Sequence, residues 1–387
     1  MSLPLAPCHM RRNARMTDFH GYFLPLSFTS ILEEAKAVRE KAGLFDISHM
    51  GHFMATGPGV RRHLNGLITS DLEAVPPGKC LYALLPNDQG GTVDDLILAA
   101  SGEDEIHVIV NAGNRDGDFA WLRDHLPKSI SLEDLSAGQI GLALQGPASS
   151  QIVSLLARGF EGMKRREARF SMGAANHLWI SRTGYTGEDG WEFFGSEESI
   201  LPLYRILSEK GGDLGLHQAG LGARDLLRLE MAYPLYGQEL TPEKTAFDAG
   251  LDFAVNLRKG SFLGKDKMLE KRAETGRNRL TGFVLTERGI PRTHCPVLDP
   301  ATGLQVGEVT SGGHSPRVGG GFGLAYMEPG FLREFEQGKE AGVEIHGKIH
   351  RARIHERPFV TGGLSGKKES AQLAVKSNGT ADQGAKR

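Results

Sequence analysis

Glycine is the residue that most constrains the fold of this chain. The sequence holds 51 glycines among 387 residues, against roughly 7% in an average protein. They are spread along the chain without the every-third-residue period of collagen. Glycine adopts backbone conformations that other residues avoid, so it is typical of tight turns. The distribution therefore predicts many turns and, between them, short strands.

The charge and hydrophobicity of the chain are those of an ordinary globular protein. The 45 Lys and Arg residues nearly balance the 47 Asp and Glu residues, which gives a net charge of −2 and no preference for a polyanion. Hydrophobic residues make up 40% of the chain and charged residues 24%. Such a chain can form about two or three domains with their own cores, and disorder throughout is excluded.

Cysteine usage and the N-terminal segment predict a reducing compartment. Cys8, Cys80 and Cys295 are too far apart for a disulfide framework or a metal-binding CxxC pair. Residues 1–16 include arginines but no apolar stretch of signal-peptide length. No window reaches the ~18 apolar residues that a membrane-spanning helix needs. We therefore expect a cytoplasmic protein, or one of the mitochondrial matrix if the source is eukaryotic.

Local patterns predict helices and strands in alternation over most of the chain. Ser30 and Glu33 form a capping box before an apolar face, which predicts a helix over 31–42 that ends at Gly43 in a left-handed conformation. Similar patterns predict helices at 60–67, 116–125, 148–157 and 223–231. Runs rich in β-forming residues predict strands at 51–55, 81–85, 92–99, 105–110, 142–145, 177–182 and 191–194.

Two of these strands, 81–85 and 92–99, flank a turn-rich segment and predict a β-hairpin. Asp94 and Asp95 lie on the second arm among apolar residues, where a carboxylate is unfavourable. Adjacent residues of a strand face opposite ways, so only one of the two can point into a given cleft. Solvation at the strand end and a carboxylate that hydrogen-bonds or accepts a proton in a cleft would each explain the pair.

The C-terminal part of the chain has a different pattern. From about residue 280 to 360, short β segments are separated by Gly and Pro, which predicts a small sandwich or barrel. The last stretch is nearly devoid of large apolar residues and is expected to be disordered. We therefore expect an α+β protein divided into residues 1–275, 276–362 and 363–387.

Two further segments are candidate ligand sites. Arg182–Glu192 is rich in glycine but connects two predicted strands, so it lacks the helix N-terminus that binds phosphate. A long turn and a loop shaped for a ligand both remain open for it. His346, His350 and His355 lie in alternating β segments rather than on one helical face, so we expect no metal site.

Six motifs spaced along the chain form a set. They are Asp46–Gly51, Gly90–Leu96, Leu144–Pro147, Arg182–Glu192, Gly222–Glu230 and Thr310–Gly312. Together they resemble, in the same order, the motifs of the aminomethyltransferases of the glycine cleavage system, the T-protein family. The resemblance covers roughly residues 13–360, and Arg182–Glu192 is its most specific part.

The resemblance implies an enzyme that takes an aminomethyl group from the dihydrolipoyl arm of a partner, the H-protein, and transfers the one-carbon unit to tetrahydrofolate. Ammonia, the reduced lipoyl-protein and 5,10-methylenetetrahydrofolate are the implied products. The implied fold is a three-domain cloverleaf around a central folate-binding channel, with a C-terminal β-barrel. We expect no nucleic-acid or membrane partner. A weak candidate surface for the acidic H-protein is the basic cluster Lys259, Lys265, Lys267, Lys271 and Arg272.

The resemblance also assigns roles to single residues. Asp95 corresponds to the catalytic aspartate near the reacting nitrogens of folate, where it would stabilise an iminium-like centre as the carbon–sulfur bond opens. Glu192 corresponds to the acid that accepts hydrogen bonds from the pterin, and Arg224 to a cleft arginine that supports folate binding. Further residues that line the folate cleft are implied at Tyr82, Asn111, Tyr185, Tyr236 and Met50.

Two alternatives and one departure accompany this interpretation. Another tetrahydrofolate-dependent methyltransferase or demethylase of the same fold is an alternative, because donor choice depends on pocket shape. A non-catalytic folate-binding protein is the other. Its iron-sulfur-assembly branch carries cysteine in a K-G-C-Y-type motif, where this chain has Lys259–Phe262. Phe253 stands where members often carry a tryptophan, which puts one folate contact in doubt. The intact Asp95 favours aminomethyl transfer.

Overall fold

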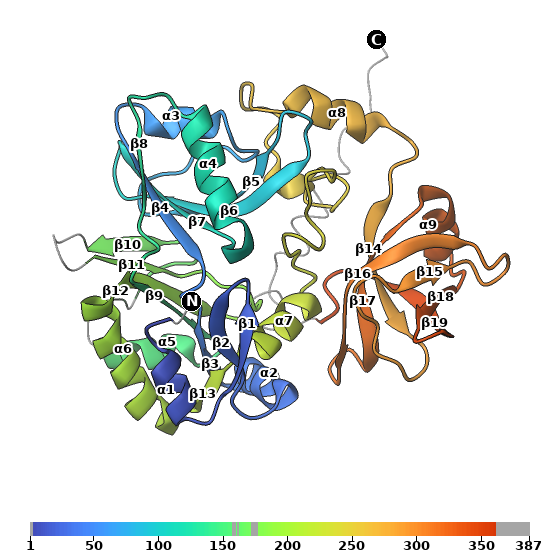
Figure 1. Cartoon of the computed structure of the whole chain (residues 1–387), viewed down its shortest axis with the longest axis horizontal. Helices are drawn as coiled ribbons and strands as arrows, with labels where there is room; N and C mark the ends of the chain where they lie inside the picture. The colour runs from blue at the N-terminus through green and yellow to red at the C-terminus, as the bar shows by residue number, and fades with distance from the viewer. Residues whose placement is uncertain (1–2, 157–159, 161, 172–176, 361–387) are drawn as a thin grey trace, which may run out of the picture.

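The chain folds into three large β-structures with helices and long connections between them (Figure 1). The computed structural model describes residues 3–156, 160, 162–171 and 177–360. The predicted disordered tail, 363–387, and the end of the helix predicted at 148–157 lie outside the described residues. Near the N-terminus, β1 (Arg15–Phe19) and β2 (Tyr22–Ser27) form a separate two-stranded hairpin.

The first β-structure is a five-stranded antiparallel sheet with helices on one face. Its elements are β4 (Gly51–Thr56), α3 (Val60–Asn65), β5 (Cys80–Pro86), β6 (Thr92–Ala100), β7 (Glu105–Val110), α4 (Arg115–His125) and β8 (Ser131–Asp134). The strand order is β5-β6-β7-β4-β8. In the β5–β6 pair, Leu84 lies opposite Asp95, which confirms the predicted hairpin and fixes where its two carboxylates lie.

The second β-structure is a six-stranded sheet covered by helices on both faces. Its elements are α1 (Ala6–Arg11), α2 (Ile31–Glu40), β3 (Ala42–Asp46), β9 (Gln139–Gln145), α5 (Ser149–Val153), β10 (Ala168–Ser171), β11 (Leu178–Ser181), β12 (Gly190–Ser196), α6 (Glu197–Lys210), β13 (Leu216–Ala219) and α7 (Leu221–Glu230). The order is β10-β11-β12-β9-β3-β13, and β13 runs parallel to β3. Residues of α5 and α6 pack on one face, and those of α2 and α7 on the other.

The third β-structure is a closed barrel, which confirms the barrel alternative of the sequence analysis. It consists of β14 (Arg279–Leu285), β15 (Pro296–Leu298), β16 (Gln305–Ser315), β17 (Gly320–Met327), β18 (Ala341–Ile345) and β19 (Lys348–His355), with α9 (Pro329–Glu336) beside them. The barrel lies to one side of both sheets, and α8 (Lys265–Ala273) belongs to the connection that leads to it (Figure 1). The predicted α+β class with a C-terminal barrel is therefore confirmed.

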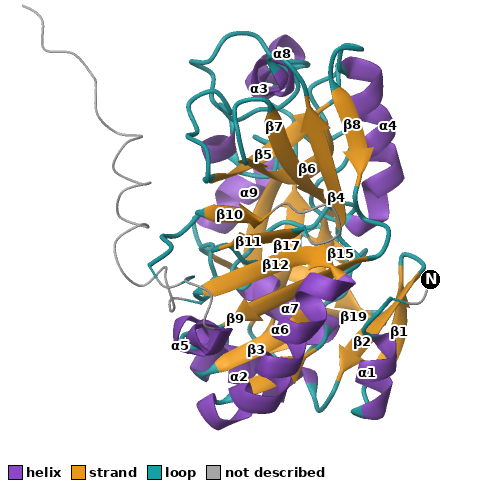
Figure 2. Ribbon diagram, turned by 90° about the vertical axis from the view of Figure 1, so that its left-hand side faces the viewer, coloured by secondary structure: helices purple, strands orange, loops and turns teal. Residues whose placement is uncertain are grey.

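One hydrophobic core joins the three β-structures. It includes Leu84 of the five-stranded sheet, Phe45 of the six-stranded sheet and Leu324 of the barrel. The two sheets lie one above the other when the molecule is seen from the side (Figure 2). In the part of the chain that the structure describes, none of the helices has the length and apolar character to cross a membrane.

The structure corrects three local predictions. The helix predicted at 31–42 starts as expected, because the Ser30 side chain accepts a hydrogen bond from the Glu33 amide, but it ends at Glu40. Gly43 lies inside β3 instead of ending the helix; a Cβ there would stand 2.4 Å from Val38 Cγ2, so glycine lets the strand approach α2.

The helix predicted at 148–157 is shorter, since α5 covers only Ser149–Val153 before a 3-10 turn. Helix α6, with 14 residues, has no counterpart in the sequence analysis. It contains Pro202, a residue that usually ends or kinks a helix. Its buried residues Ile200, Leu203 and Leu207 pack on the sheet, which stabilises the helix despite the proline.

Candidate active site

A cavity of about 1730 Å³ lies where the two sheets, α7 and the barrel meet. Both sheets contribute side chains to its walls, as do the long segment that follows α7 and the barrel strand β16. The structure brings all eight site residues predicted from the sequence to this one cavity: Met50, Tyr82, Asp95, Asn111, Tyr185, Glu192, Arg224 and Tyr236. Their proximity is a property of the fold, while their individual roles remain predictions.

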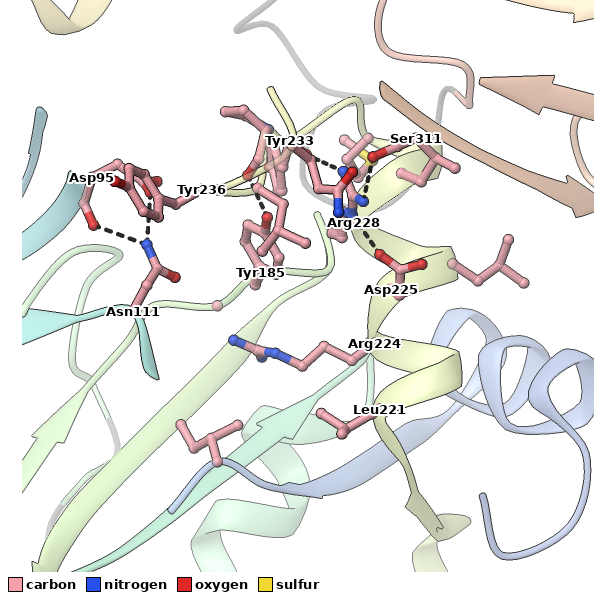
Figure 3. Close-up of a pocket in the computed structure, with 18 of the residues that line it drawn as sticks. Asp95, Asn111, Tyr185, Leu221, Arg224, Asp225, Arg228, Tyr233, Tyr236 and Ser311 are labelled. Atoms are coloured by element: carbon pink, nitrogen blue, oxygen red, sulfur yellow. Dashed lines mark hydrogen bonds and ion pairs between the residues drawn. The ribbon is translucent and has the colours of Figure 1, made fainter. Parts of the chain in front are cut away.

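The carboxylate of Asp95 is held at the cavity wall by two hydrogen-bond donors. The Tyr82 hydroxyl donates to Asp95 Oδ2 at 3.0 Å, and the Asn111 side-chain amide donates to Asp95 Oδ1 at 2.8 Å. Tyr82 comes from β5, opposite the β6 strand that carries Asp95, and Asn111 follows β7. Three neighbouring segments of one sheet thus fix both oxygens of a single carboxylate. Figure 3 shows the contact between Asp95 and Asn111.

Burial changes the acidity of this group. Two causes raise the pKa of Asp95 to about 7: its removal from water, which is the larger, and the negative charge of Asp94. The hydrogen bonds from Tyr82 and Asn111 favour the ionised form and oppose this rise. A carboxyl group with such a pKa exists in both protonation states near neutral pH, which suits it to proton transfer.

Asp94 faces away from the cavity, as the alternation of a strand requires. Its side chain is fully buried, and it is not among the residues that line the cavity. It accepts hydrogen bonds from the Asn111 backbone amide at 3.1 Å, the Asn111 side chain at 2.7 Å and the Asp95 backbone amide at 2.9 Å. Of the two aspartates, Asp95 is therefore the one that a ligand in the cavity can reach.

Glu192 lies on β12 in the opposite sheet. It is half-buried, lines the cavity and accepts a hydrogen bond from the Thr183 hydroxyl. Thr183 belongs to the glycine-rich connection between β11 and β12. A Cβ on Gly184 or Gly190 of this connection would stand 1.9 or 2.2 Å from atoms of the buried Gln145 side chain. Glycine is needed there for close packing, and that packing shapes a wall of the cavity.

Arg224 extends from α7 into the cavity (Figure 3). Its guanidinium lies 5.0 Å from the centre of the Tyr185 ring, and its Nη1 is buried without a hydrogen-bond partner among the described residues. His49 lines the same cavity and is only 3% exposed, and its Nδ1 likewise lacks a partner in the described part of the chain. Buried polar atoms normally find partners, so these two atoms are free to bind a polar ligand.

His49 is in its neutral form at neutral pH. Burial, and then the positive charge of Arg224, lower the pKa of His49 to about 3. Its ring can therefore serve as a hydrogen-bond donor or acceptor without adding charge. Burial also lowers the pKa of Arg224 from its ordinary value, while the negative charge of Glu192 opposes this shift.

Aromatic rings form much of the remaining wall. The ring of Tyr82 stacks with that of Phe253 at 6.1 Å, and the ring of Tyr185 with that of Tyr233 at 5.8 Å. Phe253 is 64% exposed although it lines the cavity. It therefore offers a flat apolar face to the cavity. Burial raises the pKa of Tyr236 to about 12, so its hydroxyl stays neutral.

The sequence analysis missed several residues of the site. Arg228, Tyr233 and Ser311 line the cavity and are linked: Arg228 donates to the Ser311 hydroxyl at 2.8 Å and to the Tyr233 carbonyl at 3.2 Å. Arg228 and Ser311 lie inside the motifs Gly222–Glu230 and Thr310–Gly312, so the motifs already contained two of the missed residues. His49 also lies inside the first motif, but the sequence analysis assigns it no role.

One part of the predicted basic surface is not exposed. Lys259 is only 7% exposed, and its ammonium group donates to the carbonyl oxygens of Asn65, Ile68 and Ser70. Its charge is therefore used inside the protein. Lys267 and Arg272 form ion pairs with Glu270 and Asp252.

Comparison with known proteins gives a family for this fold and site. Residues 5–259 match the family model described as the GCVT N-terminal domain, and residues 278–361 match the glycine cleavage T-protein C-terminal barrel domain. The chain is 42% identical over 360 residues to an aminomethyltransferase of Thermus thermophilus, with 92% of this chain and 98% of that protein covered. It is 39% identical to an aminomethyltransferase of Moorella thermoacetica, with 92% and 96% covered.

A solved structure gives the same result. The fold is similar to the crystal structure of the glycine cleavage system aminomethyltransferase T from Bartonella henselae, with a TM-score of 0.86 and 30% sequence identity. The similarity covers 94% of this chain and 99% of that one. The fold is thus that of a one-carbon transferase built from an α+β region and a C-terminal barrel. The chain belongs to the glycine cleavage T-protein family, and it is an aminomethyltransferase.

Proposed function

We propose that this aminomethyltransferase transfers a one-carbon unit from the aminomethyl-dihydrolipoyl arm of the H-protein to tetrahydrofolate. In this reaction the carbon–sulfur bond to the lipoyl arm opens, the carbon becomes bound to folate nitrogens, and ammonia leaves. The products are 5,10-methylenetetrahydrofolate and the reduced lipoyl-protein. The observation that carries the proposal is the Asp95 carboxylate, held by two donors at the wall of a cavity that all eight residues predicted from the sequence line.

The side chains present fit tetrahydrofolate as a substrate. A pterin carries several N–H donors, and Glu192 offers carboxylate oxygens to accept them. The flat faces of Tyr82, Tyr185 and Phe253 suit a heterocycle and its aryl extension. The unpartnered donor on Arg224 would serve an acceptor atom of the folate or of the arm.

The Asp95 carboxylate would act where positive charge develops. When the carbon–sulfur bond opens, the carbon bound to nitrogen gains iminium-like character, and a fixed carboxylate nearby stabilises it without reorganisation. The pKa of Asp95 near 7 also lets this group take up a proton from a folate nitrogen and return it to the departing amine.

A reconstituted assay tests the proposal. The purified protein is mixed with H-protein that carries the aminomethyl-lipoyl group, and ammonia is measured with and without tetrahydrofolate. We expect tetrahydrofolate to accelerate ammonia release strongly, with methylenetetrahydrofolate formed in equal amount. If folate binds but does not accelerate release, the donor is a different methylated compound or the protein only binds folate.

A further inference from the structure

A third buried aspartate lies behind the Asp94–Asp95 pair. Asp118, on α4, has no exposed surface, and neither does Asp94 on β6. Asp118 does not line the cavity, so it cannot contact a substrate there. Its carboxyl group lies within hydrogen-bonding reach of the Asp94 carboxyl group.

The hydrogen bonds around these two groups are unequal. Asp94 accepts three hydrogen bonds, two from Asn111 and one from the Asp95 backbone amide. Asp118 Oδ1 accepts one, from the Asn114 side chain at 2.8 Å, and Asp118 Oδ2 is buried without a donor among the described residues. Two facing carboxylates that are both buried and both ionised are strongly unfavourable, so one of them holds a proton. The group with fewer donors is the one that gains most from being protonated.

We propose that Asp118 holds this proton and donates it from Oδ2 to the Asp94 carboxylate, and that Asp118 is thereby a positioning residue for Asp95. The proton explains why a buried oxygen with no donor of its own is tolerated. The hydrogen bonds then run in a consistent direction, from Asp118 to Asp94 and from Asn111 to both Asp94 and Asp95.

Asn111 is the link between the pair and the cavity. Its side-chain amide donates to Asp94 at 2.7 Å and to Asp95 at 2.8 Å. An ionised Asp94 therefore holds the Asn111 side-chain amide in place, and this amide in turn holds the Asp95 carboxylate in place. The negative charge of Asp94 also helps to raise the pKa of Asp95, so Asp118 acts on both the position and the acidity of Asp95.

The charged and titratable groups around this network come from several elements. Asp95 faces Tyr82 of β5 and Asp94 on its own strand. Asp118 faces Asp94 and Asp95, with Asn114 as its polar neighbour. Tyr236, in the segment that follows α7, experiences the charges of Asp94 and Asp118. Burial and the neighbouring carboxylates raise the pKa of Asp118 to about 11, in agreement with a proton held at neutral pH.

The kinetic part of the test compares three variants, and it rests on the proposed role of Asp95. Asp118→Asn keeps an acceptor for Asn114 and supplies an N–H donor to Asp94, so we expect a kcat within about threefold of the wild type. Asp118→Ala removes the donor, and we expect kcat to fall about 10²-fold because Asn111 and Asp95 are no longer fixed. Asp116→Asn, an exposed aspartate of the same helix, is the matched control and should have no effect.

The pH profile separates positioning from loss of structure. Without its donor, Asp94 binds a proton more readily, so less negative charge acts on Asp95 and the pKa of Asp95 falls. The limb of the kcat profile that belongs to Asp95 should therefore move to lower pH in Asp118→Ala and stay in place in Asp118→Asn. An unmoved limb in a folded Asp118→Ala protein would overturn the proposal.

Infrared spectroscopy tests the proton without any substrate. A protein labelled with ¹³C-aspartate should show the stretching band of a protonated carboxyl group in mildly alkaline buffer, and this band should be absent in Asp118→Asn. Absence of the band from the wild type overturns the proposal even if Asp118→Ala does not fold. A large loss of kcat in a folded Asp118→Asn protein would do the same. If the wild type shows the band but has no transfer activity, the proposed function is refuted, while the conclusion that Asp118 holds a proton still stands.

Discussion

Asp95 is the residue whose chemistry depends most on its surroundings. In water its carboxyl group would be ionised at neutral pH, but burial and Asp94 bring its pKa to about 7. The same burial leaves Arg224 Nη1 and His49 Nδ1 without partners among the described residues. Unpaired buried polar atoms and an acid with a raised pKa make the folded protein less stable than full pairing would. Sites that bind and transform a ligand usually have such features.

Asp95→Asn should lower kcat by roughly 10² to 10⁴, because an amide cannot carry the negative charge or exchange the proton. The dissociation constant for tetrahydrofolate should change little, since asparagine has the same size and can still accept from Asn111. Turnover with aminomethylated H-protein and folate binding by calorimetry measure the two quantities. Asp88→Asn, in the exposed turn between β5 and β6, is the control, and near-normal kcat in Asp95→Asn would refute the catalytic role.

Glu192→Ala should mainly weaken folate binding. Hydrogen bonds to a charged acceptor contribute about 1.5–3 kcal/mol, which corresponds to roughly a 10- to 100-fold higher dissociation constant. Calorimetric titration with tetrahydrofolate measures this constant, and Glu209→Ala, on the exposed side of α6, serves as control. An unchanged constant would mean that Glu192 does not bind the pterin.

At the scale of elements, a chain of polar side chains crosses from one sheet to the other. His52 on β4 contacts His107 on β7 at 2.9 Å and Gln139 on β9 at 2.9 Å. Gln139 in turn contacts His177, just before β11, at 2.8 Å. Burial is the largest cause that lowers the pKa of His52, to about 3, and it also lowers that of His107. Both rings are therefore neutral in the folded protein at neutral pH.

These histidines predict a loss of stability in acid. The unfolded chain binds protons on His52 and His107 below about pH 6.5, whereas in the folded protein the pKa of His52 is about 3 and the pKa of His107 is lowered as well. The free energy of unfolding should therefore fall as pH drops from about 6.5 toward 3, by up to about 1.4 kcal/mol per pH unit for His52, and His107 should add to this fall in the same direction.

Denaturant unfolding at several pH values measures this slope. His52→Gln removes one titrating ring while keeping polar atoms, so its slope should be shallower than that of the wild type. His217→Gln, on an exposed part of β13, should leave the slope unchanged. Equal slopes for the wild type and His52→Gln would contradict the assignment.

At the scale of the whole molecule, buried ions join the barrel to the rest. Arg228 of α7 is 3% exposed and pairs with the fully buried Glu239 at 3.1 Å, and it donates to Ser311 of the barrel strand β16. Arg39 of α2 pairs with Glu230, which accepts a hydrogen bond from Ser315 of the same strand. Arg228 and Ser311 both line the cavity, so their contact stabilises the arrangement of its walls, while the Arg39–Glu230–Ser315 contacts hold the barrel against α7 and α2.

Arg228→Met should destabilise the protein by about 3–5 kcal/mol, because Glu239 would remain buried without its cation. The free energy of unfolding in urea measures this loss. Arg123→Met, which removes an exposed arginine that pairs with its neighbour Asp124, should have little effect. A loss below about 1 kcal/mol for Arg228→Met would show that the pair is not essential to the fold.

Much of the fold followed from local patterns, and part of the site followed from the resemblance of the motifs. The start of α2 depends on Ser30 and Glu33, and the β5–β6 hairpin on the turn residues between its arms, so neighbours in sequence decide both. The barrel was expected from closely spaced β segments, and the resemblance of the motifs pointed to eight of the residues that line the cavity. The division at residues 275 and 362 and the roles of the eight predicted site residues remain predictions.

The sequence by itself determined which residue types were available, where most strands and helices begin, and to which family the motifs are similar. Only the tertiary structure decided that Asp95 rather than Asp94 faces the cavity, that Asp118 lies behind them, and that Lys259 is buried. Helix α6 and the place of Gly43 inside β3 also depend on packing against distant segments. The physical reason is that desolvation, close approach and charge pairing depend on distances between residues far apart in the chain, which local patterns do not contain.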